Sequence, residues 1–126
     1  MAGITYDTGA LIAAERSDDR LWRLHRRALE RGIVPSVPAG VLAQGWRGGP
    51  QPQMSRFLAG CRIEDLDEPR ARSAGAACSL AGTSDIVDAA VVVGAAARDD
   101  LAVTSDASDL SRLRHALGVE LQVHEI

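Results

Sequence analysis

The sequence predicts a single α/β domain, residues 1–126, built on a parallel β-sheet that helices cover on both faces. Short runs rich in Val and Ile alternate along the chain with longer runs whose apolar residues recur at helical spacing, and this alternation is typical of such sheets. A chain of 126 residues is long enough for one domain with a substantial core. The first strand ends at Asp7, and ligands of open α/β sheets bind beyond the carboxyl ends of the strands.

The composition is that of an ordinary globular protein, with 46% hydrophobic and 25% charged residues. Aromatic residues make up only 3%, so Ala, Val, Leu and Ile should form the core. The net charge of −3 argues against a basic coat for nucleic acid, although the acids could be concentrated in one site. All 14 basic residues are Arg; a codon bias explains that count without any function.

The first third of the chain predicts a strand and two helices. Residues 3–7 form a buried strand, and residues 8–14 continue at once as a helix. A turn at 17–19 precedes a second helix, in which the apolar residues between Leu21 and Leu29 share one face. We expect His25, which lies among arginines in that helix, to be solvated.

The middle third predicts a strand at 33–37, which a proline shortens. Pro38 suits the first position of a helix at 39–47, and the Gly-Gly-Pro run ends this helix. A helix at 51–60 and an edge strand at 62–66 follow.

The last third begins with an Ala-rich helix at 68–80. The helix at 85–97 is apolar almost all round and should therefore be buried against the sheet. A strand at 101–104, a helix at 108–117 and a last strand at 119–123 complete the chain.

Several features indicate a cytoplasmic protein. Cys61 and Cys78 show no metal-binding spacing and are interpreted as reduced structural thiols. The amino terminus lacks the basic start and apolar run of a signal peptide. The longest apolar stretch, residues 89–97, is too short to span a membrane.

Four carboxylates are predicted to stand where strands end or helices begin. Asp85 and Asp88 share one face of the helix at 85–97, and Asp106 follows a strand, as Asp7 does. If the strands that carry Asp7 and Asp106 are neighbours, these acids converge in one crevice. A divalent cation relieves such repulsion, and carboxylate oxygens match Mg²⁺ or Mn²⁺ better than Zn²⁺. Such a site suits phosphodiester hydrolysis. The alternative is that these acids, and Asp109 with them, only cap helices.

The chain resembles PIN-domain ribonucleases, specifically the VapC-type toxins of bacterial toxin–antitoxin pairs. The matching stretches are YDTGALI at 6–12, PAGVLAQ at 38–44, DAAVV at 88–92 and VTSD at 103–106, in the family's order from end to end of the chain. The resemblance implies a three-layer α/β/α PIN-like domain with a central parallel sheet of four to five strands. It also implies Mg²⁺ or Mn²⁺, endonuclease activity on single-stranded RNA, a homodimer and a VapB-type antitoxin as partner.

The resemblance assigns catalytic and metal-binding roles to Asp7, Asp88 and Asp106. It leaves six residues as possible additions to the site: Asp85, Asp109, Gln44, Thr8, Thr104 and Ser105. Gln44 departs from the family, which usually has a glutamate there. The site therefore carries one negative charge fewer than is usual in the family, unless Asp85 supplies that charge.

Two functions remain open on the sequence, and a third is largely excluded. The first is a metal-dependent endoribonuclease toxin. The second is a PIN-like domain that binds RNA or a partner with weak or lost nuclease activity, which the neutral Gln44 favours. The third is a phosphatase or phosphotransfer receiver; receivers use a Lys near the last strands, and this chain has no Lys.

Overall fold

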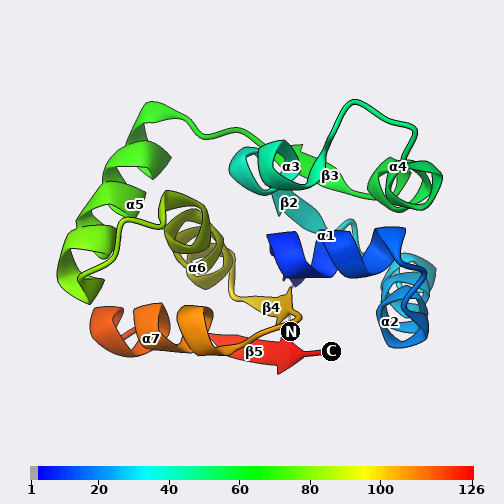
Figure 1. Cartoon of the computed structure of the whole chain (residues 1–126). Coiled ribbons are helices and arrows are strands. Elements are labelled where there is room, and N and C mark those ends of the chain that lie inside the picture. Colours follow the sequence, from blue (N-terminus) through cyan, green and yellow to red (C-terminus); the bar gives the residue numbers. More distant parts are fainter. Residues whose placement is uncertain (1–2) are drawn as a thin grey trace.

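The computed structural model describes residues 3–126, and within them five parallel strands form one sheet between two layers of helices (Figure 1). The strand order is β3-β2-β1-β4-β5. The strands are β1 Gly3–Tyr6, β2 Ser36–Pro38, β3 Arg62–Glu64, β4 Asp100–Thr104 and β5 Gln122–Glu125. The predicted three-layer α/β/α fold with a parallel sheet is confirmed, and so is the edge position of β3.

The helices are α1 Thr8–Glu15, α2 Asp19–Glu30, α3 Ala39–Gly45, α4 Pro52–Ala59, α5 Glu68–Ala81, α6 Ile86–Arg98 and α7 Ser108–Leu117. α5, α6 and α7 pack on one another in one layer, and α1 packs on α2, α3 and α4 in the other (Figure 1). Most helix ends differ from the sequence-based prediction by one or two residues. The prediction that the helix from residue 86 is buried against the sheet is confirmed, since five of its nine Ala and Val residues are buried.

Two strands lie further along the chain than the sequence predicted. β2 begins at Ser36 and not at residue 33, because Pro35 has no N–H to donate to the ladder. β5 begins at Gln122 and not at residue 119. The segment before it is held to the end of α7, where the Val119 N–H donates to Arg114 O and the Arg114 guanidinium donates to Leu121 O.

The prediction that His25 is solvated is wrong, since only 2% of its surface is exposed. Its ring stacks on Phe57 with centroids 4.0 Å apart, and Nδ1 lies 2.9 Å from the hydroxyl of Tyr6. Burial lowers the pKa of His25 to about 4. Trp22 meets Phe57 edge to face and completes an aromatic cluster that ties α2 and α4 to β1. Three of the four Phe, Trp and Tyr residues are thus concentrated at one place in the core, whereas Trp46 is exposed. Leu21, on the same helix as His25, is also fully buried.

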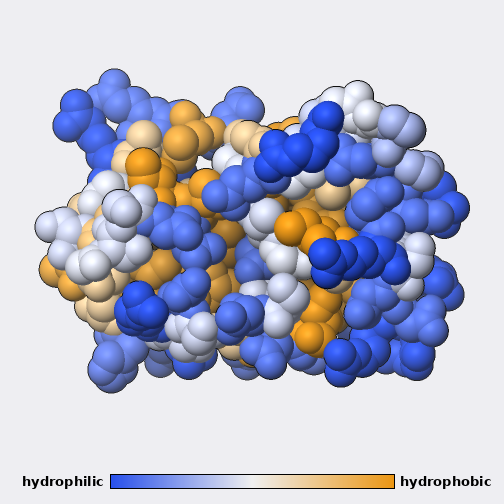
Figure 2. All heavy atoms as spheres, in the orientation of Figure 1, coloured by the Kyte–Doolittle hydropathy of each residue, from blue (hydrophilic) through white to orange (hydrophobic). Residues whose placement is uncertain are grey.

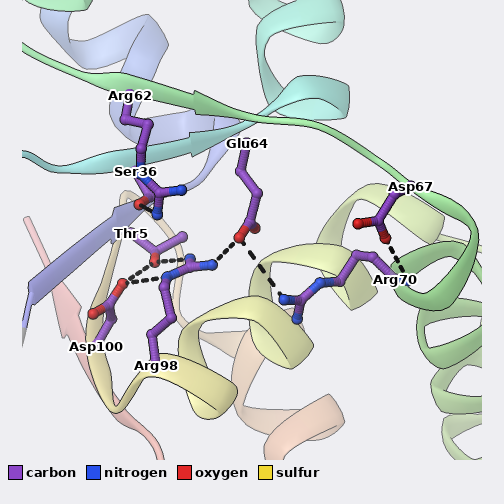
Figure 3. Close-up of polar contacts among 8 residues, drawn as sticks. All are labelled: Thr5, Ser36, Arg62, Glu64, Asp67, Arg70, Arg98 and Asp100. Atoms are coloured by element: carbon purple, nitrogen blue, oxygen red, sulfur yellow. Dashed lines mark hydrogen bonds and ion pairs between the residues drawn. The ribbon is translucent and has the colours of Figure 1, made fainter.

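A network of charged and hydroxyl side chains joins β1, β2, β3 and β4 to α5 and α6 (Figure 3). The Arg98 guanidinium donates to Asp100 at 3.0 Å, to Thr5 at 2.9 Å and to Glu64. Thr5 donates to Asp100 at 2.8 Å. The flanking contacts are those of Arg70 with Glu64 at 3.8 Å and of Arg62 with Ser36 at 2.7 Å. This network attaches the edge strand β3 to the interior strands.

Cys61 and Cys78 are free thiols, as predicted, and burial raises the pKa of Cys61 to about 12. Among residues 3–126, no single helix is long and apolar enough to cross a membrane. α5 and α6 meet that criterion only when they are taken together, across a bend of 110°.

Candidate active site

The candidate site lies at the carboxyl ends of β1 and β4, which are neighbours in the sheet. Tyr6 is paired with Val103, and the Asp7 N–H extends the ladder by donating to Val103 O at 3.1 Å. Convergence of Asp7 and Asp106 requires the strands before them to be neighbours, and they are: both acids follow adjacent parallel strands at the same edge of the sheet. On the face drawn in Figure 2, hydrophilic residues surround separate hydrophobic patches, one of which lies over α1.

Asp7 caps α1 and is almost completely buried. Its Oδ1 accepts the Ala10 N–H at 2.9 Å, and 7% of the residue is exposed. Burial raises the pKa of Asp7 and the charge of Asp106 adds to that shift, while the neighbouring Thr104 hydroxyl and the N–H groups of Ala10 and Gly9 oppose it. Asp7 thus has the helix-capping role that an acid favours at this position, and its carboxylate also interacts with the loop after β4.

The beginning of α6 brings Asp85 and Asp88 together. Asp85 is the N-cap, and its Oδ1 accepts the Asp88 N–H at 3.0 Å. The pKa of Asp88 rises to about 7; burial is the largest cause, followed by Asp85, Asp109 and Asp7. The negative charges of three other acids, from three parts of the chain, therefore act on the Asp88 carboxylate.

Asp85, Asp88 and Asp109 line a small cleft of about 60 Å³ between α6 and α7. Arg112, one helical turn after Asp109, lines the same cleft and pairs with Asp109 at 3.3 Å. The sequence prediction did not include Arg112, although its spacing of three residues from Asp109 is the signal that could have revealed it. The cleft thus contains its own guanidinium.

Asp106 is exposed and turned toward its own loop. Its Oδ1 accepts hydrogen bonds from the N–H and the hydroxyl of Ser108, at 3.0 and 2.8 Å, and these bonds lower its pKa. The Thr104 hydroxyl is used within the same turn, where it accepts the Asp106 N–H at 3.0 Å and donates to Asp106 O. Thr104 is 1% exposed. Its position supports the loop that carries Asp106.

Gln44 is an exposed residue of α3 that faces the start of α1. Its Oε1 accepts a hydrogen bond from Thr8 Oγ1 at 2.6 Å, and its main-chain oxygen accepts one from Arg47. Ser105 packs against Gly9 so closely that a Cβ on Gly9 would lie 2.1 Å from Ser105 Oγ. Thr8, Gln44 and Ser105 therefore border the crevice next to Asp7.

The donor set of this region fits Mg²⁺ or Mn²⁺ by its chemistry, because it consists of carboxylate and hydroxyl oxygens. The crowding of acids on Asp88 is the feature that a cation would relieve. Within residues 3–126, however, no group of three or more His, Cys, Asp or Glu side chains is gathered closely enough to hold an ion. The joint binding of one ion by Asp7, Asp88 and Asp106 stays a prediction.

The fold is shared with chains of two solved complexes. One is VapBC2 from Rickettsia felis bound to a DNA fragment from its promoter, with a TM-score of 0.72, 15% identity and coverage of 98% of each chain. The other is DNA-bound VapBC from Salmonella typhimurium, with a TM-score of 0.70, 15% identity and coverage of 99% of this chain and 98% of that one. No family model and no curated protein matches the sequence. The likeness confirms the PIN-like fold and spans the whole chain.

Proposed function

We propose that this chain is a VapC-like toxin, a metal-dependent endoribonuclease that hydrolyses phosphodiester bonds of single-stranded RNA. The observation that carries the proposal is the cleft that Asp85, Asp88 and Asp109 line together, with Asp7 following β1 at the carboxyl edge of the sheet. This edge is the position where open α/β sheets bind ligands. The charge of Asp7 contributes to the raised pKa of Asp88. The structural likeness to VapBC complexes supports the toxin class.

Asp7, Asp88 and Asp106 would hold Mg²⁺ or Mn²⁺. When bound, the ion activates water and stabilises the charge that develops on the phosphate. Asp85 and Asp109 add negative charge beside Asp88. Thr104 positions the loop of Asp106, and the hydrogen bond between Thr8 and Gln44 fixes the start of α1 and hence Asp7. Because Asp88 has a pKa near 7, ion binding should strengthen as the pH rises through neutrality.

The partner in this proposal is a VapB-type antitoxin, and the protein acts as a homodimer in the cytoplasm. A crevice of crowded carboxylates attracts a guanidinium for the same reason that it attracts a divalent ion. We expect an Arg of the antitoxin to inhibit by competing with Mg²⁺. Inhibition that survives replacement of every Arg in the antitoxin's carboxyl-terminal segment would contradict this mechanism.

A PIN-like domain that binds RNA or a partner without cutting is the second candidate. Two observations favour it: Gln44 is neutral, and the carboxylates of residues 3–126 are not gathered as an ion-binding group. In this case the acids serve mainly as helix caps, as the hydrogen bonds of Asp7 and Asp85 illustrate.

Cleavage of a labelled single-stranded RNA by the purified full chain separates the two candidates. We expect cleavage with Mn²⁺ or Mg²⁺, none with EDTA, and loss of cleavage in Asp7→Asn and Asp88→Asn. Asp99→Asn is the matched control, because Asp99 lies at the opposite end of α6, is exposed, and has a positive φ that Asn tolerates. RNA binding without cleavage at millimolar Mn²⁺ would favour the second candidate.

A further inference from the structure

A groove of about 430 Å³ lies between α2 and the sheet, away from the candidate active site. Its floor is aliphatic. Ile4 and Leu101 come from neighbouring positions on β1 and β4, and Leu24 and Ala28 come from α2. This volume is typical of sites that take up the side chains of a ligand.

Four arginines form the rim of this groove. Arg20, Arg23, Arg27 and Arg31 follow one another at spacings of three and four residues, so they lie along one side of α2. Among the residues that the structure describes, none of these guanidinium groups makes a hydrogen bond or ion pair, and no carboxylate lines the groove.

The rim differs from the rest of the protein in its charge. The chain has a net charge of −3, and four arginines outside the rim are paired with acids: Arg70, Arg72, Arg98 and Arg112. Like charges at helical spacing destabilise a helix. A row of four arginines beside an apolar floor therefore has an electrostatic cost, which a ligand with the opposite charge would remove.

We propose that this groove is a docking site for a segment of another protein that carries apolar side chains on one face and carboxylates beside them. The apolar face would cover Ile4, Leu24 and Leu101, and the carboxylates would pair with the arginine rim. The site goes beyond the proposed nuclease function, since none of the groove residues belongs to the candidate active site.

The chemistry of the groove favours such a segment over RNA or a second copy of the chain. Single-stranded RNA is bound mainly by stacking its bases on aromatic side chains, and among the described residues the groove offers the ring of His124 but no Trp, Tyr or Phe. A symmetric pair of chains that joined through this groove would set one arginine row against the other. An amphipathic segment with carboxylates needs no aromatic stacking, and it sets negative charges against the arginine row.

Binding of a labelled amphipathic peptide to the full chain tests the proposal. The probe is a peptide of about 15 residues, long enough to form a helix, with Leu on one face and Glu on the others; its counterpart carries Lys in place of every Glu. Fluorescence anisotropy in EDTA, at low salt and at high salt, reports binding without any contribution from metal.

We expect saturable binding of the Glu peptide that weakens at high salt, and no binding of the Lys peptide. The double variant Arg23→Glu with Arg27→Glu should weaken binding at least about tenfold. Arg26→Glu is the matched control, because Arg26 is exposed on the same helix but does not line the groove. Asp88→Asn should bind as the natural chain does, so that failure of the nuclease proposal leaves this result unaffected.

Three results would overturn the proposal. The first is the absence of saturable binding of the Glu peptide up to about 1 mM. The second is equal binding by the natural chain and a correctly folded double variant, with folding checked by thermal unfolding. The third is evidence for a different occupant of the groove. Such evidence would be binding of a labelled single-stranded RNA that requires Arg23 and Arg27 while peptide binding does not, or a change in the oligomeric state of the double variant, measured by light scattering.

Discussion

Thr8 donates a hydrogen bond from its Oγ1 to the side-chain oxygen of Gln44, 2.6 Å away, and thereby joins the start of α1 to α3. The residue at position 44 therefore reaches the border of the crevice next to Asp7. A glutamate at this position could accept the same hydrogen bond and would add a negative charge. The effect of position 44 on ion binding can thus be tested without removing the contact to Thr8.

Gln44→Glu should tighten Mn²⁺ binding by about tenfold, the scale of changes around metal ligands, and raise any ribonuclease activity. Asp85→Asn should weaken both in the natural chain and less so in the Gln44→Glu background, because either acid can supply the missing charge. Asn at position 85 can still accept the Asp88 N–H, so the helix cap is kept.

Mn²⁺ titration and RNA cleavage across the four members of this double-mutant cycle measure the coupling. Gln122→Glu, the same charge change at an exposed position where β5 begins, is the control. Additive effects of the two substitutions would show that Asp85 does not compensate for Gln44.

Gly9→Ala should lower the free energy of unfolding by about 1–3 kcal/mol, the usual cost of overpacking. The added Cβ would lie 2.1 Å from Oγ and 3.1 Å from Cβ of Ser105. Ser105→Ala should therefore rescue the variant only in part. Gly75→Ala is the control: nothing lies within 4 Å of its added Cβ, and Ala in place of a helical Gly should stabilise by about 0.5–1 kcal/mol. Urea unfolding in which Gly9→Ala is as stable as the natural chain would refute the close packing of α1 against the loop after β4.

Asp88→Asn should stabilise the folded chain at pH 8 and leave its stability unchanged near pH 3. The pKa of Asp88 is about 7 in the folded chain against an ordinary value of 3.8, so folding opposes its ionisation. The resulting loss of stability begins as the pH rises above about 4 and is complete above about 7. Urea unfolding of both proteins across this range, without divalent ions, measures the difference. A constant difference at every pH would contradict the raised pKa.

His25 should make the protein sensitive to mild acid. Its pKa is about 4 in the folded chain against an ordinary 6.5, so the unfolded chain binds more protons between these values. Stability should be complete above pH 6.5 and fall as the pH decreases toward 4. His25→Phe should lower stability at pH 7.5, because Tyr6 loses its partner, but should flatten the decrease between pH 6.5 and 4. Replacement of the exposed His115 by Gln should leave that decrease unchanged.

Arg98→Ala should lower the free energy of unfolding by about 3–5 kcal/mol, the cost of removing one partner of a buried ion pair. Asp100 is 7% exposed and would keep only the hydrogen bond from Thr5. Arg72→Ala is the comparison, since Arg72 forms an exposed pair with Glu68 that should contribute at most about 1 kcal/mol. Equal effects of the two substitutions in urea unfolding would show that the network does not stabilise the sheet.

The sequence by itself determined the features that depend on neighbours along the chain. The order of strands and helices, the limits of α7 and the capping position of Asp7 all follow from apolar periodicity and from the turn and cap residues next to each element. Pro35 shows the limit of this reasoning. Its effect on the ladder moved the start of β2, although the strand itself was predicted.

Only the tertiary structure decided which distant residues meet. His25 is buried because its ring stacks on Phe57 and is hydrogen-bonded to Tyr6. Neither contact can be inferred from the helical spacing of residues 19–30. The crowding of Asp88 by Asp7 and Asp109 and the pairing of Arg98 with Glu64 likewise join residues far apart in the chain. Local propensity and periodicity describe a few neighbouring residues, whereas the burial and pairing of a side chain depend on every element that packs around it.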